Sequence, residues 1–83
     1  MAIQSFFRIE NDSANTAILY IEPEGAAFPL GGGEAVMVFD EFTKSPVTVR
    51  LAKTDEGEIC ISIWPGDGKV KVEKGGVNLF DLM

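Results

Sequence analysis

The sequence predicts a single antiparallel β-sandwich, with a small β-barrel as the alternative. In several short runs, apolar and polar residues alternate with a period of two, which is typical of β-strands. Glycine, proline and other turn residues separate these runs, and no window has the apolar period of an amphipathic helix. The 83 residues fit one all-β domain that spans residues 1–83.

The first half of the chain contains four predicted strands and three turns. In EPEG, Pro23 fixes φ at the second turn position and Gly25 accepts the positive φ that follows. The triple glycine at 31–33 precedes a strand and Glu34 rather than a helix and a lysine, so it indicates a turn and not a phosphate-binding loop. The strands are Ile3–Glu10, Thr16–Glu22, Ala26–Leu30 and Glu34–Phe39.

The second half alternates more regularly between apolar and polar positions. We expect the isoleucines of EICISIW to point inward, and likewise the valines of KVKVE and the apolar positions Val47, Val49 and Leu51 of VTVRLAK. The last run, VNLFDLM, alternates in both registers; it is predicted to complete the sheet, or alternatively to dock into another subunit. The strands are Val47–Lys53, Glu58–Trp64, Lys69–Glu73 and Val77–Leu82.

Two runs, AILYI and AVMVF, are apolar on both faces. An antiparallel sheet of a monomer normally has one polar face, so the second apolar face needs a cover. Either loops or the inside of a barrel cover it, or another protein chain does. Because Trp64 ends a strand, it either closes one end of the sandwich or serves as an exposed aromatic anchor. The predicted contact residues are Phe6, Ile18, Tyr20, Met37, Phe39 and Trp64.

The charge is acidic and unevenly distributed. The net charge is −6, and residues 1–43 carry the whole excess, with seven acids and one base. Such a field repels phosphate backbones and anionic lipids and attracts basic partners. We therefore expect neither nucleic-acid nor membrane binding.

The residue types for most enzymatic and metal chemistry are missing. The chain has no histidine, the commonest ligand of zinc, copper and iron, and Cys60 is its single cysteine. Acidic loop clusters such as Asp55-Glu56-Gly57-Glu58 lack the spacing of an EF-hand and indicate turns. We expect no catalytic residue, no bound metal and no cofactor.

The layout IENDSANTAILYIEPEGAAFPLGGGEAVMV resembles small uncharacterised bacterial proteins with an immunoglobulin-like or cupredoxin-like sandwich. The resemblance covers the first half of the chain and implies an immunoglobulin-like, Greek-key fold without an activity. A copper site of the cupredoxin type needs histidine ligands, which this chain lacks.

These observations predict a non-catalytic protein-interaction module that forms homo-oligomers through its apolar strand faces. A lone thiol and an N-terminus without the pattern of a secretion signal favour the cytoplasm. The alternative is an acidic inhibitor or immunity-type protein that covers a basic partner such as a nuclease.

Overall fold

The computed structural model describes all residues, 1–83, and contains eight strands and one short 3-10 helix. Six of the eight predicted strands differ from the observed strands, four of them by one residue at one or both ends, which is the usual uncertainty of a strand boundary. The elements are β1 (Ile3–Glu10), β2 (Ala17–Ile21), β3 (Ala26–Leu30), β4 (Ala35–Phe42), β5 (Thr48–Lys53), β6 (Ile59–Trp64), β7 (Lys69–Lys74), β8 (Val77–Asn78) and η1 (Leu79–Leu82).

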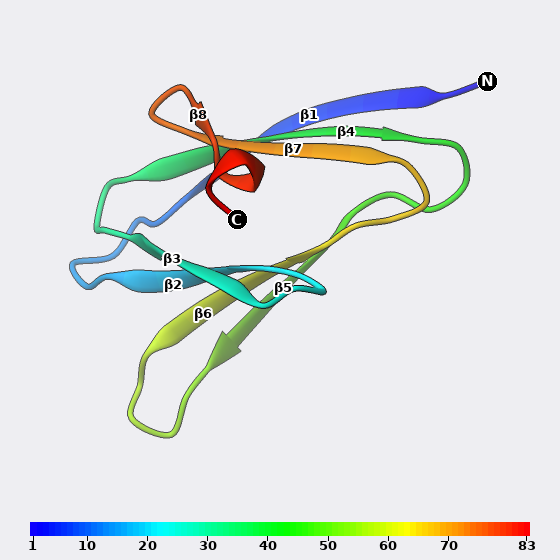
Figure 1. Ribbon diagram of the computed structural model, residues 1–83. Helices are drawn as coiled ribbons and strands as arrows, with labels where there is room; N and C mark the ends of the chain where they lie inside the picture. The colour runs from blue at the N-terminus through cyan, green and yellow to red at the C-terminus, as the bar shows by residue number, and fades with distance from the viewer.

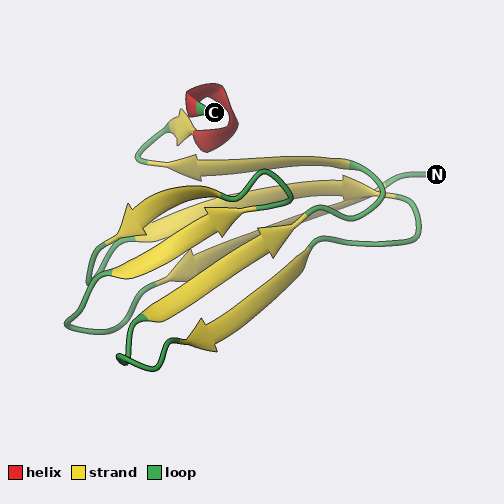
Figure 2. Ribbon diagram, turned by 60° about the horizontal axis from the view of Figure 1, so that its bottom comes forward, coloured by secondary structure: helices red, strands yellow, loops and turns green.

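The strands form two packed four-stranded sheets, which confirms the predicted β-sandwich. One sheet, here called sheet A, has the order β1-β4-β7-β8, and the other, sheet B, has the order β3-β2-β6-β5. Figure 1 shows sheet A as the upper layer and sheet B as the lower layer, and Figure 2 shows the same layers obliquely. Each sheet ends in two edge strands, so the sheets do not close into the alternative barrel.

One strand pair departs from the expected antiparallel arrangement. All pairs are antiparallel except β2 with β6, which are parallel and align Leu19 with Ile61 and Ile21 with Ile63. The hairpins β2–β3 and β5–β6 join through this pair. The alternation of apolar residues is the same in parallel and antiparallel strands, which is why the sequence could not distinguish them.

The core lies between the sheets and contains most of the residues that were expected to point inward, with Val49 and Leu51 of β5 as exceptions. Leu19, Ile21, Val36 and Val38 are fully buried, and the neighbours that were expected to point outward, such as Tyr20, are more exposed. One-residue register slips would reverse every face, so the burial pattern confirms the predicted registers. The ten buried apolar residues are Ala17, Leu19, Ile21, Leu30, Val36, Val38, Ile61, Ile63, Val72 and Leu79.

The C-terminal strand is shorter than predicted. Only Val77 and Asn78 pair with β7, and the chain then turns into η1. The side chain of Asn78 accepts a hydrogen bond from the backbone N–H of Phe80, which caps the turn and replaces a strand hydrogen bond. Leu79 is 3% exposed, so η1 contributes to the core of its own chain.

The strand β5 is more exposed than predicted. It was predicted to be half-buried, but all six of its residues are exposed, and Val49 and Leu51 retain 40% and 76% of their surface. β5 is an edge strand of sheet B, and Figure 1 shows it at the lower margin of that sheet, away from sheet A. Alternation identifies the face on which a side chain lies but does not reveal whether the opposite sheet extends over it.

Both predicted glycine turns are observed. Gly25 has a φ of +75° and donates its N–H to the carbonyl oxygen of Ile21, while Gly33 has a φ of +82°. The N–H of Gly31 binds the carboxylate of Glu34, a position that a phosphate would take in a phosphate-binding loop. This hydrogen bond, with help from Lys74, lowers the pKa of Glu34.

A buried asparagine organises the loop between β1 and β2. Asn11 is 6% exposed, and its side-chain NH₂ donates to the carbonyl oxygens of Asn15 and Leu30, both at 2.8 Å. Its side-chain oxygen accepts from the hydroxyl of Ser13. The loop is thereby attached to the end of β3 through fully used polar groups.

Two carboxylates fix the crossover between β4 and β5. Asp67 accepts the backbone N–H groups of residues 43, 44 and 45 at 3.0, 2.8 and 3.1 Å, and these bonds, that of Thr43 first, lower its pKa. The buried Asp40 accepts the N–H of Val47 at 2.8 Å through one oxygen, and its other oxygen has no partner. A Cβ at Gly66 or Gly68 would collide with the backbone of this crossover or of β4, so glycine permits the close approach.

Candidate functional site

The outer face of sheet A brings aromatic side chains from two strands together. Because Phe6 and Phe7 are adjacent in β1, they point to opposite faces: Phe7 packs against the core, and Phe6 points outward. Phe6 pairs with Phe39 of β4, and Phe39 pairs with Lys71 of β7. These three residues form a row across the outer face, with Met37 one row further along β4.

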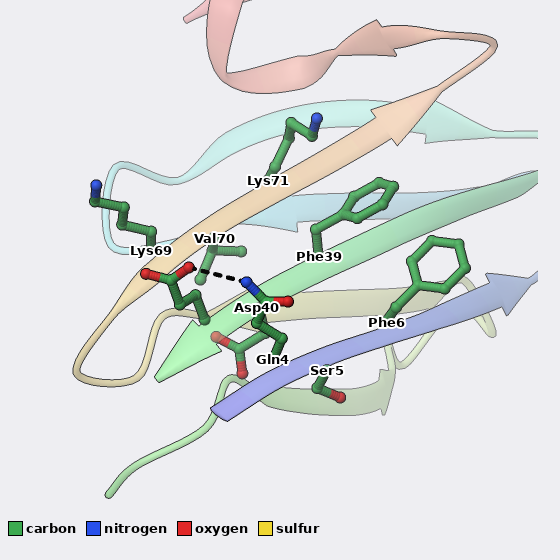
Figure 3. Close-up of a pocket in the computed structure, with 9 residues that line it drawn as sticks. Gln4, Ser5, Phe6, Phe39, Asp40, Lys69, Val70 and Lys71 are labelled. Atoms are coloured by element: carbon green, nitrogen blue, oxygen red, sulfur yellow. Dashed lines mark hydrogen bonds between the residues drawn. The ribbon is translucent and has the colours of Figure 1, made fainter. Parts of the chain in front are cut away.

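The two rings contact each other and remain open to solvent. Their centroids lie 4.6 Å apart with the planes tilted by 34°, a favourable arrangement for an aromatic pair. Phe6 is 60% exposed. The ammonium group of Lys71 lies 4.7 Å from the centroid of Phe39, within the range of a cation–π interaction. Figure 3 shows both rings and Lys71 on one side of the strands, with Ser5 and Asp40 pointing to the other.

The rings stand beside a hollow of about 550 Å³. Polar side chains border it in one row: Gln4 and Glu41 form a hydrogen bond of 3.4 Å, and Lys69 of β7 is the neighbour of Glu41 on its other side. The outward charges of β1, β4 and β7 balance, with three bases and three acids, in a chain whose net charge is −6. These charges are Arg8, Lys69, Lys71, Glu10, Glu41 and Glu73.

The other predicted contact residues lie on the outer face of sheet B, on the opposite side of the molecule. Ile18 and Tyr20 point outward from β2, where they are half-buried and pair with Cys60 and Ser62. Trp64 is 36% exposed at the end of β6, with the guanidinium of Arg50 at 5.7 Å from its ring. The six predicted residues therefore form two separate groups, Phe6, Met37 and Phe39 on sheet A and Ile18, Tyr20 and Trp64 on sheet B.

The structure also exposes apolar residues that the sequence had assigned to the core side. These are Leu51 and Val49 of β5; Ile3 of β1, for which no face was predicted, is also 52% exposed. Each lies on an edge strand, which is a property of the strand order and not of the local pattern. The sequence also did not predict the polar border of the hollow. Gln4, Glu41 and Lys69 lie close together only because β1, β4 and β7 are neighbours in the sheet.

The shifted titratable groups are two carboxylates that hold loops. The two carboxyl groups with a shifted pKa, Glu34 and Asp67, have it lowered, and both accept backbone N–H groups. A lowered pKa favours a permanently charged acceptor, whereas a general acid needs a raised one. No group of three or more cysteine, aspartate or glutamate residues is placed to hold a metal ion. None of the helical structure is long and apolar enough to span a membrane.

Comparison of the chain with known protein families, curated proteins and solved structures finds no match. The function must therefore be inferred from the surfaces of the sandwich itself.

Proposed function

We propose that this protein is a non-catalytic interaction module that associates with copies of itself through the outer face of sheet A. The observation that carries the proposal is the outward aromatic pair of exposed Phe6 and half-buried Phe39, beside half-buried Met37, on a face that a monomeric sheet would normally cover with polar residues. The half-buried single thiol, Cys60, fits the reducing cytoplasm, which we propose as the compartment.

The charge of this face supports contact between copies. Two chains of net charge −6 repel each other, and repulsion is smallest where the facing charges balance. The outer face of sheet A carries equal numbers of bases and acids around its aromatic centre. The excess acids lie elsewhere, so this face can approach its own copy without a net like-charge penalty.

The order of the charges across the face is also self-complementary. Bases and acids occupy opposite margins of one row, Arg8 on β1 and Glu73 on β7, with Met37 between them. A two-fold axis along β4 would bring Arg8 of one copy opposite Glu73 of the other. The same axis would place each Phe6 opposite the second copy's Lys71. Such an isologous contact is the commonest form of homodimer.

The expected association is of moderate strength. Burying an aromatic side chain that is exposed in the monomer contributes about 1.5–3 kcal/mol, and the two-fold symmetry doubles each contribution. Association itself costs at least about 4 kcal/mol in lost freedom of motion. A small interface with one aromatic pair per copy is therefore expected to hold a dimer at micromolar concentration.

Light scattering coupled to gel filtration tests the proposal. The unaltered chain should elute as a dimer or larger at high micromolar concentration, and Phe6→Thr should elute as a monomer because it removes the more exposed ring and keeps a good strand former. Trp64→Thr on sheet B is the matched control and should leave the dimer intact. A monomeric unaltered chain, or a dimer that only Trp64→Thr dissociates, would overturn the proposal.

A further inference from the structure

The inner face of sheet B has apolar residues on β5 that sheet A does not cover. Val49 pairs with Ile63 and Leu51 with Ile61, so these four side chains lie on the same face of the sheet. The isoleucines are 1% and 6% exposed, whereas Val49 is 40% and Leu51 76% exposed. The inner face of sheet B therefore continues onto its edge strand without a cover.

The two sides of the sandwich close differently. Lys74 of β7 donates a hydrogen bond of 3.0 Å to the carbonyl oxygen of Pro29, so β7 and β8 lie near β3. On that side η1, which follows β8, inserts Leu79 into the core. β1 and β5 are the edges that remain on the other side, where Ile3 is 52% exposed on β1. No element closes this side.

The open edge is also positively charged. β5 contains Arg50 and Lys53 and no acid, and neither base takes part in an ion pair. Trp64 lies beside the Arg50 guanidinium, which places that charge on the outer face of β5. In a chain of net charge −6, this strand is a local site for an acidic partner.

We propose that β5 accepts an extended strand of another protein, in which apolar residues alternate with acidic residues. The strand would pair with the free backbone edge of β5, its apolar side chains would cover Val49 and Leu51 on the inner face, and its carboxylates would meet Arg50 on the outer face. Strand addition of this kind takes affinity from main-chain hydrogen bonds and specificity from alternate side chains. The inference rests on the interaction role proposed above but uses a different surface.

A second copy of this chain fits the edge less well. Pairing β5 with its own copy would bring two Arg50 side chains onto one outer face without an acid between them, and like charges across a strand pair are unfavourable. Basic residues on an edge strand are a common protection against such self-pairing. The same charges leave an acidic strand as the favoured occupant.

Synthetic peptides and nuclear magnetic resonance test this proposal. One peptide alternates valine with glutamate, the other valine with lysine, and both are N-methylated along one edge so that they cannot pair with themselves. We expect the glutamate peptide to bind about tenfold more tightly, to shift the amide signals of residues 48–53 and to weaken as salt rises. Absence of binding, equal binding of both peptides, or shifts confined to the outer face of sheet A would overturn the proposal.

Charge reversal on the protein provides the second readout. Arg50→Glu changes an exposed side chain, so the fold should be retained, and the preference should move toward the lysine peptide. Lys44→Glu, which changes the net charge equally in a loop, should preserve the preference for glutamate. Phe6→Thr should abolish self-association and leave peptide binding unchanged, so the two proposals fail separately. An Arg50→Glu variant with unaltered preference would contradict strand docking on β5.

Discussion

Leu19 and Leu51 are the same residue type on the same face of sheet B, and the structure predicts opposite consequences for their truncation. Leu19 is fully buried, and truncation of such a leucine to alanine costs about 2.7–5.0 kcal/mol. Leu51 keeps 76% of its surface exposed, so only about a quarter of its burial energy of about 1.5–3 kcal/mol is realised. We expect Leu51→Ala to cost less than about 1 kcal/mol.

Thermal denaturation monitored by circular dichroism at low micromolar concentration measures the difference. For a domain of this size, 1 kcal/mol corresponds to about 4–8 °C in midpoint. Leu19→Ala should lower the midpoint by more than about 10 °C and Leu51→Ala by less than about 8 °C. Equal losses would refute the exposed position of β5. A loss for Leu51→Ala that appears only at high concentration would mean that another copy covers this strand.

Four further substitutions test the loops. Gly68→Ala should destabilise the fold by about 3 kcal/mol, because the added Cβ would collide with the backbone of Glu41. Gly31→Ala should destabilise it less, because there the Cβ contacts only the flexible side chain of Glu34. Urea denaturation compares the free energies of unfolding of the two variants. Asn11→Ala should cost about 1–3 kcal/mol in the same assay, since two carbonyl oxygens lose their donor, and no loss would refute the network. Because the pKa of Asp67 is lowered, the ionised carboxylate stabilises the fold at neutral pH, and this stabilisation is lost as the pH falls through the folded-state pKa. Asp67→Asn should therefore flatten the decrease of the urea midpoint with falling pH below about pH 4. The same decrease in the variant as in the unaltered chain would contradict this.

Strand positions and faces could be predicted because both follow from local chemistry. The runs around Leu19 and Val38 are apolar on both faces, but the choice of Tyr20 and Phe39 as outward residues agrees with the structure, where Leu19 and Val38 are buried instead. The turns were equally local, since Gly25 and Gly33 both adopt the positive φ that glycine permits. Two strand ends were wrong by more than one residue: β4 continues to Phe42 instead of ending at Phe39, and β8 ends at Asn78, where a side-chain cap competes with continued pairing.

The arrangement of the sheets could not be predicted, because it depends on contacts between distant segments. Parallel pairing of β2 with β6 leaves no mark on the alternation of either strand. The exposure of Leu51 depends on how far sheet A extends, and the hollow beside Phe6 depends on three strands that are separated in sequence. The sequence indicated a surplus of apolar surface, and the strand order decides where it lies.

The most direct measurement is an isotope-filtered nuclear Overhauser experiment on a mixture of labelled and unlabelled protein at high micromolar concentration. Self-association through sheet A predicts contacts from the Phe6 ring of one copy to the Lys71 and Met37 side chains of another. A mixture that shows no contact between copies, or contacts only around Tyr20 and Trp64, would contradict it.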